Sequence, residues 1–339
     1  MEQRKIMSLG RSSLVIALPK EWIRLNELEK GDVVSLDVKY DRSLSIFPSL
    51  EKKWEEQRIT LTIDPNEEDS IIARRMIACY LNGYSGIRLV SAGIFSASQQ
   101  SAIRDIARTL YMRIIESDTK QIYVENLVEE AKPEIKSSIS RMHTISSSMC
   151  QNIFIALKNR DISMAKTVVT LDDDVDHFSF FLLRLLRNAA VDSALANQLA
   201  IDPVDCLDYQ MLVHRIEEVA DKAVYIANNL IMLEGRQEKI SKTILERIYT
   251  AGINTLTMYD KAVNGLVAKD ITNCDEIIEF QTKKIEEFDR EIVSLPFTEE
   301  KDALILCALD RIRDSIKIIA GCAAEIAEIT IDQSYKLLP

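Results

Sequence analysis

The pattern of hydrophobic and polar positions divides the chain into three segments. In residues 1–49, short β-rich runs alternate with turn residues such as Gly31 and Asp32. The pattern predicts four strands and one short helix, at Lys5–Leu9, Ser13–Leu18, Lys20–Leu25, Val33–Tyr40 and Leu44–Phe47. A module this small buries little apolar surface by itself, so we expect it to need a partner chain.

Residues 51–133 alternate strand patterns with amphipathic helix patterns. The expected elements are strands at Arg58–Ile63 and Ile87–Val90, helices at Glu68–Leu81 and Ala97–Leu110, and a closing strand pair at Met112–Glu116 and Gln121–Val124. This order predicts a small sheet with helices on one side. The segment contains neither a Gly-rich phosphate loop nor a nucleophile elbow, so a connecting or interaction role is expected.

Residues 134–339 have apolar positions at helical spacing and repeat internally. The matching pairs are Leu157–Ile162 with Leu266–Ile271, Val175–Phe178 with Ile285–Phe288, and Glu217 and Asp221 with Asp310 and Asp314. Their offsets are 109, 110 and 93 residues, which places a longer connection in the first copy, at Asn188–Asp205. We predict two tandem three-helix bundles, over residues 134–235 and 242–332. Their helices are expected at about 138–159, 162–188, 206–233, 243–268, 271–295 and 299–331.

The net charge and its distribution along the chain limit the functions that this protein can have. The net charge is −11, and residues 134–339 carry most of it, with 23 basic and 33 acidic side chains. This excludes a broad nucleic-acid-coating surface, although residues 1–50, with 8 basic and 7 acidic side chains, could still form a local basic surface. No apolar run is long enough to span a membrane, so we expect a cytoplasmic protein. The 6 cysteines and 3 histidines lack zinc spacing and are expected to be buried, reduced thiols and ordinary histidines.

The first segment resembles the SpoVT/AbrB (MazE-like) domain of transcription factors and antitoxins. The resemblance is carried by Ser12–Trp22, Leu28–Val34 and Ser43–Ile46. It implies an intertwined dimer of swapped hairpins with a basic face on DNA. The positions that would contact DNA are Arg4, Lys5, Arg11, Ser12 and Lys20. The alternative is that these are solvated surface residues and that the module only dimerises.

Paired carboxylates recur on the predicted helices. Residues four apart share a helix face, so Glu217 and Asp221 lie side by side, as do Asp310 and Asp314. Asp172 repeats the spacing with Asp176 on a neighbouring helix. Two such pairs facing each other would repel, and a hard cation with oxygen ligands would relieve the repulsion. The alternative is a solvated acidic face.

The tandem copies resemble the PhoU family of phosphate uptake regulators, through Leu171–Asp176, Arg215–Ala227 and Leu309–Asp314. The middle segment looks like that of archaeal PhoU-type regulators. The resemblance implies divalent or ferric ions, with iron, magnesium or manganese as candidates. The implied ligands are Asp172, Asp173, Asp176, Glu217, Asp221, Glu286, Asp310 and Asp314. Thr282 stands where the second copy should repeat Asp172, so its site is expected to be weaker or different. His177 and His214 do not fall at ligand positions.

Two functions remain open, and neither is enzymatic, because no catalytic set of residues stands out. The first is a phosphate-responsive regulator that binds DNA as a dimer and senses phosphate status through metal-binding bundles. The second is an adaptor without a DNA role, which contacts a phosphate transporter ATPase or a phosphate sensor kinase.

Overall fold

A computed structural model gives the structure of this chain, and it describes residues 3–10, 13–38, 43–48, 57–126, 135–288, 290 and 302–336. The chain divides into two compact units, the first comprising Met1–Glu55 and the second residues 56–338. The expected middle segment and both helical copies therefore belong to one unit.

The first unit contains two antiparallel hairpins and one short helix. Its elements are β1 (Met7–Leu9), β2 (Ser13–Val15), α1 (Lys20–Leu25), β3 (Ser35–Val38) and β4 (Leu44–Phe47). Element types and order agree with the sequence pattern, but three of the four strands are shorter than expected. Gly10, at the end of β1, has φ +74°, a left-handed conformation that glycine adopts without steric cost.

Among its described residues, the first unit shows no buried core of its own. None of its described residues is buried, and large apolar side chains are exposed on both hairpins. They include Met7, Leu9, Leu14, Leu36, Val38 and Leu44. An isolated two-stranded hairpin is at best marginally stable in water.

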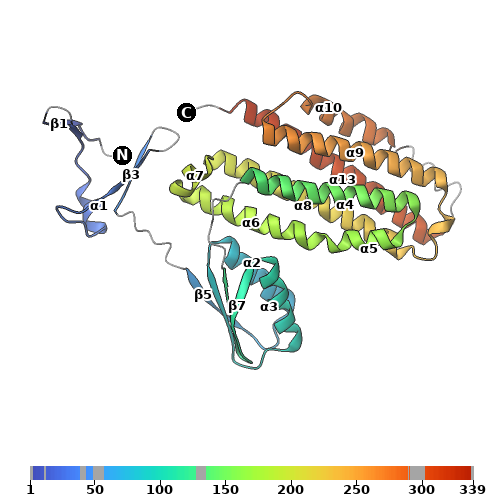
Figure 1. Ribbon diagram of the computed structural model, residues 1–339, viewed down its shortest axis with the longest axis horizontal. Coiled ribbons are helices and arrows are strands. Elements are labelled where there is room, and N and C mark those ends of the chain that lie inside the picture. Colours follow the sequence, from blue (N-terminus) through green and yellow to red (C-terminus); the bar gives the residue numbers. More distant parts are fainter. Residues whose placement is uncertain are drawn as a thin grey trace. The chain divides into compact units, whose positions relative to one another are not determined.

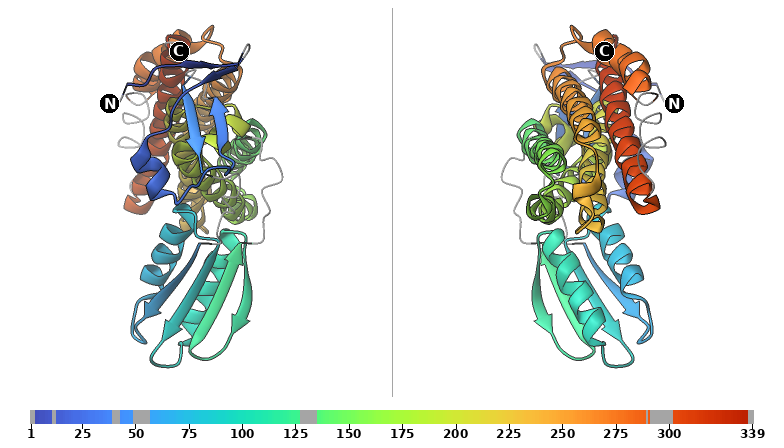
Figure 2. Two further views of the ribbon diagram at one scale, coloured as in Figure 1. Left: turned by 90° about the vertical axis from the view of Figure 1, so that its left-hand side faces the viewer. Right: turned by 90° about the vertical axis from the view of Figure 1, so that its right-hand side faces the viewer.

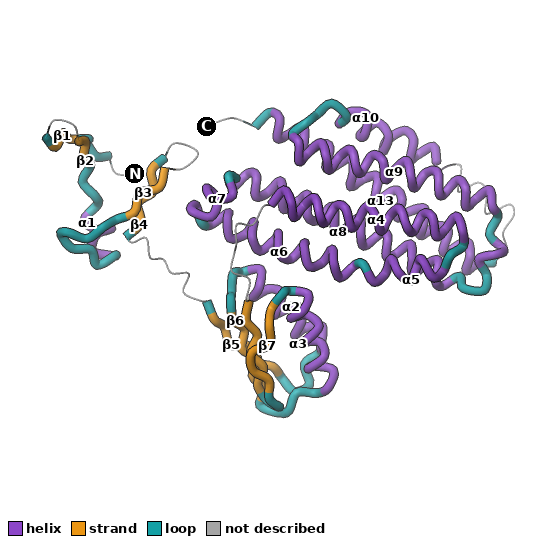
Figure 3. Tube along the Cα trace, viewed as in Figure 1, coloured by secondary structure: helices purple, strands orange, loops and turns teal. Residues whose placement is uncertain are grey.

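An α/β layer opens the second unit. Its elements are β5 (Arg58–Ile63), α2 (Asp69–Leu81), β6 (Gly86–Ser91), α3 (Ala97–Thr109), β7 (Met112–Ser117) and β8 (Gln121–Asn126). The sheet order is β5-β6-β8-β7, with β5 parallel to β6 and the other pairs antiparallel. Figures 2 and 3 show both helices on one face, as the sequence order predicted. Alternate residues of the strands supply the core, for example Ile87 and Leu89 of β6, which are fully buried.

Arg184 fixes the α/β layer to the helical region. Its guanidinium is buried and donates hydrogen bonds to the carbonyl oxygens of Tyr80, Gly83 and Tyr84 at the end of α2. It also lies 4.6 Å from the centre of the Tyr80 ring. The Tyr80 carbonyl also accepts from the Gly83 N–H at 3.0 Å, so the arginine adds charged donors to the carbonyl oxygens around the end of α2.

Among the described residues, the helical region has five long helices with shorter helical segments between them. Figure 1 shows the long helices side by side. The first copy is α4 (Ile135–Asn159), α5 (Ile162–Thr170), α6 (Asp172–Val191), α7 (Ser193–Leu199) and α8 (Pro203–Met232). A 3-10 turn at Gln237–Lys239 connects the two copies. The second copy is α9 (Lys242–Ala268), α10 (Cys274–Glu279), a π-helical stretch at Phe280–Ile285, and α13 (Ala303–Ser334). Residues 289 and 291–301 of the expected second and third helices lie outside the described residues.

One helix expected over 162–188 is in fact two. α5 ends at Thr170, and α6 begins at Asp172 with three consecutive aspartates in its first turn. Negative charge is favourable at a helix N-terminus, which explains why a new helix starts there. The continuous amphipathic pattern across Leu171 concealed the break.

The expected long connection at Asn188–Asp205 is also largely helical. α6 continues to Val191, and Asp192 caps α7 by accepting from the N–H groups of Ala194 and Leu195. α7 ends where Ala200 takes a left-handed conformation, with φ 54°. α8 then starts at Pro203, three residues earlier than expected, behind a capping box formed by Asp202 and Asp205. Proline in the first turn after an aspartate cap was the sequence signal for this start.

The two copies do not form two separate bundles. Their buried residues belong to one continuous cluster, in which α4 packs on α9 and α8 packs on α13. Gly252 of α9 lies against Phe154 of α4 so closely that an added Cβ would come 2.6 Å from the ring. Helices that bury apolar stripes on two sides join the copies into a single core.

The internal repeat extends to the ends of the first helices. Arg160 after α4 and Lys269 after α9 stand 109 residues apart, and both have φ 58°. In each case the next residue, Asp161 or Asp270, donates its N–H to a carbonyl five residues earlier, at 2.8 Å. This left-handed helix ending is a Schellman-type motif. None of the described helices is long and apolar enough to cross a membrane.

Candidate functional site

Carboxylates of α6 and α8 gather where these two helices pack together. Asp172 and Asp176 come from the first turns of α6, and Glu217 and Asp221 come from the middle of α8. We call these four residues the carboxylate cluster. Burial raises the pKa of Asp172 to about 6 and that of Asp176 to about 7, and repulsion from the other carboxylates adds to both shifts. The influence of Glu217 and Asp221 on both aspartates indicates that the two acidic pairs lie near each other.

Asp173 and Asp221 belong to the same electrostatic environment. The exposed Asp173 carboxylate contributes to the raised pKa of both Asp172 and Asp176. The pKa of Asp221 is also raised, first by burial and then by Glu217, while Lys222 acts in the opposite direction. Repulsion therefore extends over the whole cluster.

Few side chains relieve this repulsion. The Ser179 hydroxyl donates to Glu217 Oε2 at 2.9 Å, and His214 Nδ1 lies 3.5 Å from the same oxygen. Within the described part of the chain, neither lysine nor arginine forms an ion pair with a cluster residue. Sequence reasoning placed His214 near the acids without giving it a role, and it did not identify Ser179, which stands three residues after Asp176.

The equivalent pair in the second copy is neutralised internally. Arg313 Nη2 lies 2.8 Å from Asp310 Oδ1 and 3.2 Å from Asp314 Oδ1, so one guanidinium bridges both carboxylates. Glu286 is exposed just after the π-helical stretch, and none of its described contacts joins it to either aspartate. The structure thus gives a second reason, besides Thr282, why a metal site here should be weaker or different.

The predicted ligands have the chemistry of a metal site but not its arrangement. Clustered carboxylates supply the oxygen donors that hard cations prefer. Across the described ranges, however, no group of three or more His, Cys, Asp and Glu side chains has the arrangement of a metal site. Metal binding by Asp172, Asp173, Asp176, Glu217, Asp221, Glu286, Asp310 and Asp314 stays a prediction.

The other histidines make structural contacts. The His177 ring stacks on Tyr111 of the α/β layer, with centroids 4.6 Å apart. His143 Nε2 lies 2.9 Å from Asp260 Oδ1, which also accepts from the Ser147 hydroxyl at 2.9 Å. This second network joins α4 to α9 and was not identified from sequence, because its partners are more than a hundred residues apart. The cysteines are all free, and five are buried as expected, but Cys307 is exposed.

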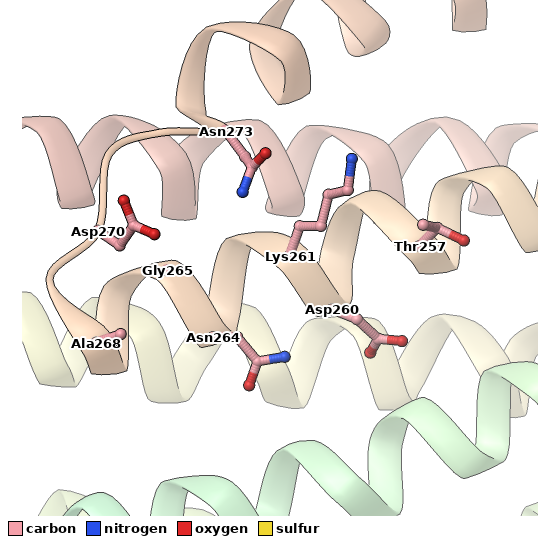
Figure 4. Close-up of a pocket in the computed structure, with 8 residues that line it drawn as sticks. All are labelled: Thr257, Asp260, Lys261, Asn264, Gly265, Ala268, Asp270 and Asn273. Carbon is pink, nitrogen blue, oxygen red and sulfur yellow. The ribbon is translucent and has the colours of Figure 1, made fainter.

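A polar hollow of about 420 Å³ opens where α9 turns into α10 (Figure 4). Figure 4 shows Lys261 and Asn273 on one side of α9 and Asp260 and Asn264 on the other. The remaining lining residues are Thr257, Gly265, Ala268 and Asp270. Asp260 holds α4 through His143, Lys261 Nζ lies 2.8 Å from Glu276 of α10, and Asp270 accepts from the Thr272 N–H. The charged groups of the hollow thus already serve the packing of α9.

The predicted DNA-contacting residues lie in the first unit. Arg4, Lys5 and Lys20 are exposed, the first two just before β1 and the third at the start of α1. Arg11 and Ser12 lie outside the described residues. The DNA-binding assignment of all five stays a prediction.

Part of this chain is similar to a known protein family. Residues 139–230 match the family model of the PhoU domain. The matched range contains the whole carboxylate cluster and most or all of each helix from α4 to α8. The second copy, with Asp310 and Asp314, lies outside it.

Among solved structures, the chain is similar to PhoU from Pseudomonas aeruginosa, with 17% identity and a TM-score of 0.49. That alignment covers 58% of this chain and 93% of the other. A search of curated proteins finds no match to the chain. The family-model match supports a PhoU domain over residues 139–230 of this chain.

Proposed function

We propose that this protein is a regulator of phosphate uptake rather than an enzyme, and that it binds DNA through a dimer of its first unit. The PhoU-domain match over residues 139–230 supports the link to phosphate uptake. The single observation that carries the DNA-binding part is the composition of the first unit, which pairs exposed apolar hairpins with exposed basic residues.

We expect dimerisation because none of the described residues of the first unit is buried. The first unit exposes Met7, Leu9, Leu14, Leu36, Val38 and Leu44 to between 52% and 75%, although all six lie on its strands. Apolar strand residues are expected to be covered in a stable protein, and a second copy of the same hairpins would cover them. This is the interleaved arrangement implied by the resemblance of residues 1–49 to the SpoVT/AbrB domain.

DNA binding is tested by titrating labelled promoter DNA with the full-length protein and with an Arg4→Ala/Lys5→Ala/Arg11→Ala variant. We expect the variant to bind at least tenfold more weakly and to show a smaller dependence of affinity on salt. Each phosphate contact that is lost reduces the number of counterions released when the protein binds DNA. Lys120→Ala, an exposed lysine in the second unit, is the control and should bind like the wild type. Equal and salt-insensitive binding by all three proteins would contradict DNA recognition by this unit.

We further propose that the carboxylate cluster binds a hard cation, for which iron, magnesium and manganese are candidates. The support is that α6 and α8 pack together and carry four carboxylates, and that burial and then repulsion from the other carboxylates raise the pKa of Asp172 and Asp176. A bound cation would supply positive charge that relieves this repulsion, with Asp172, Asp176, Glu217 and Asp221 as its first candidate ligands and Asp173 near it.

Elemental analysis of protein purified without chelator tests the cation proposal. The wild type should contain metal, and a variant with Asp172→Asn, Asp176→Asn, Glu217→Gln and Asp221→Asn should lose most of it. The matched control is Asp310→Asn/Asp314→Asn in the second copy, which should retain the metal because Arg313 already neutralises that pair. Unchanged metal content in the first variant would show that the ligands are assigned wrongly.

A second candidate function is that of an adaptor which contacts a phosphate transporter ATPase or a phosphate sensor kinase without binding DNA. It is favoured by one observation, an apolar stripe left exposed along α8 beside the carboxylate cluster. Mapping DNA occupancy across the genome at high and low phosphate separates the two functions. Peaks at phosphate-transport promoters support the DNA-binding regulator, and an absence of peaks supports the adaptor.

A further inference from the structure

One face of α8 stays exposed along most of its length. Four of its large exposed apolar side chains are Val204, Leu207, Met211 and Tyr225, with exposures of 49%, 66%, 48% and 44%, and the fifth, Met232, ends the helix. The first three are spaced by three and four residues, and Tyr225 follows Met211 by two heptads, so all four lie along one line of the helix. We call these four residues the α8 stripe. The opposite faces of α8 are buried against α4, α5, α6 and α13.

The α8 stripe is interrupted by negative charge. Asp221 precedes Tyr225 by one helical turn, and Glu217 precedes Asp221 by another, with Asp172 and Asp176 of α6 beside them. Along α8, the surface therefore has an apolar end at Val204–Met211, an acidic centre at Glu217 and Asp221, and an aromatic end at Tyr225. A partner that covers it must bring apolar groups at its ends and positive charge at its centre.

The internal repeat shows how this fold neutralises such a pair. In the second copy, the Arg313 guanidinium bridges Asp310 and Asp314 and is largely buried, with 15% of its side chain exposed. At the offset of 93 residues, Arg313 corresponds to Ala220 and Arg311 corresponds to Glu218. The first copy thus has the acidic pair but no arginine at this position. Lys222 of the same helix acts against the raised pKa of Asp221, but among the described residues neither lysine nor arginine forms an ion pair with Glu217 or Asp221.

We propose that, when the carboxylate cluster holds no metal ion, it binds together with the α8 stripe an amphipathic helix of a partner protein, whose central arginine takes the place that Arg313 takes in the second copy. Its apolar residues pack on Leu207 and Met211 at one end and on Tyr225 at the other. An arginine suits the centre because its planar fork can bridge two carboxylates at once. The inference rests on the second candidate function, contact with a partner protein, and names the surface and chemistry of that contact.

A second copy of this chain is a poor occupant. Residues 134–339 carry 33 acidic and 23 basic side chains, so two such regions repel each other at this surface. A basic helix from another protein gains from the same charge, both in the rate of encounter and in the choice of partner.

Binding is tested with a fluorescent synthetic helix that has leucines at heptad positions and arginines at its centre, against full-length protein in the presence of chelator. A matched peptide carries glutamates in place of the arginines. Fluorescence anisotropy should show saturable binding of the arginine peptide and at least tenfold weaker binding of the glutamate peptide. Equal binding of the two peptides, or no binding of either, would overturn the proposal.

Variants locate the site. Glu217→Gln/Asp221→Asn should weaken binding of the arginine peptide at least tenfold, and Leu207→Ser/Met211→Ser should also weaken it, since these side chains are exposed and their replacement leaves the core intact. Asp310→Asn/Asp314→Asn is the matched control and should bind like the wild type. An equal loss in this control would overturn the assignment to the first copy.

Ala220→Arg places the missing guanidinium within the chain and should abolish peptide binding without removing an acid. Circular dichroism checks that this variant is folded, because Ala220 is fully buried, and the Glu217→Gln/Asp221→Asn variant decides the question if it is not. Manganese binding to a protein that ignores both peptides would overturn the helix proposal and leave a cation as the occupant. DNA affinity, measured on the same variants, should be unchanged, which separates this test from the test of DNA binding.

Discussion

At the scale of single residues, position decides what a charged side chain does. Arg184 and Arg313 are both largely buried, yet one satisfies carbonyl oxygens at the end of α2 and the other bridges two aspartates. Asp176 is also partly buried but has other carboxylates as its neighbours. Its charge therefore opposes folding, whereas the charges of the two arginines are compensated.

The stability of the second unit should depend on pH through this aspartate. The folded-state pKa of Asp176, about 7, lies above its unfolded value, so the folded state holds the proton more tightly. The stabilisation is fully present below about pH 4 and is lost as pH rises towards about 7. Asp176→Asn should weaken this dependence and stabilise the protein at neutral pH by about 1 kcal/mol after allowance for solvent screening.

Urea unfolding followed by circular dichroism in chelator, at a series of pH values, measures this difference between variant and wild type. The variant must be compared with the wild type because other carboxylates also make stability depend on pH. Lys336 and Arg236 hold down the pKa values of Asp202 and Asp302 respectively, and these two groups change stability in the opposite sense. Asp314→Asn, whose carboxylate is paired with Arg313, is the control. Parallel pH profiles for Asp176→Asn and the wild type would show that the carboxylates do not repel each other as the structure indicates.

At the scale of elements, caps and helix endings set the boundaries that the apolar pattern leaves open. The start of α6 is marked by three aspartates, and that of α8 by Asp202, Pro203 and Asp205. The endings of α4 and α9 share one left-handed motif, although neither has a glycine at the position that favours it. These two endings can be compared directly, because the surrounding hydrogen bonds are the same.

Glycine at the two left-handed positions should have opposite effects. Lys269 is exposed, and Lys269→Gly should raise the free energy of unfolding by about 0.5–1 kcal/mol by removing the strain of φ 58°. Arg160→Gly should lower it, because the Arg160 guanidinium donates to the carbonyls of Gln237 and Ile240 at 2.9 and 2.7 Å and holds the link between the copies. Chemical unfolding of both variants measures the two changes, and a gain in stability for both would mean that these hydrogen bonds contribute little.

At the scale of the whole molecule, the chain has two compact units that differ in how much apolar surface their described residues bury. The second unit shares one helical core between its two copies, and Arg184 and the His177–Tyr111 contact tie the α/β layer to it. The first unit has no buried residue among those described. The two units should therefore unfold separately, and only the first should depend on association.

Both tryptophans, Trp22 and Trp54, precede residue 56, whereas nearly all of the helices follow it. Thermal unfolding followed by tryptophan fluorescence should shift to higher temperature as protein concentration rises, because a dimer is stabilised by mass action. Unfolding followed by far-ultraviolet circular dichroism should be one transition that does not depend on concentration. A single transition seen by both probes at every concentration would contradict both the independence of the units and the dimer.

Local sequence patterns were sufficient for most element types and their order, but they missed α7 and the break between α5 and α6. Turn residues and alternation gave the hairpins of residues 1–49, the β-α-β-α-β order gave the α/β layer, and the 109-residue repeat gave two related helical copies. The spacing of four residues also placed both halves of the carboxylate cluster on their helix faces. These features depend on residues close together in the chain, so periodicity and capping determine them.

Only the tertiary structure decided what lies between distant segments. Packing of α4 on α9 and α8 on α13 makes one core from two copies, and packing of α6 on α8 brings the acidic pairs of the two helices into one cluster. The sequence determined which side chains carry charge and which face of each helix they occupy, because helical geometry is local. Whether a charge is buried, repelled or compensated depends on which helices pack together, and that is settled by apolar burial across the whole fold.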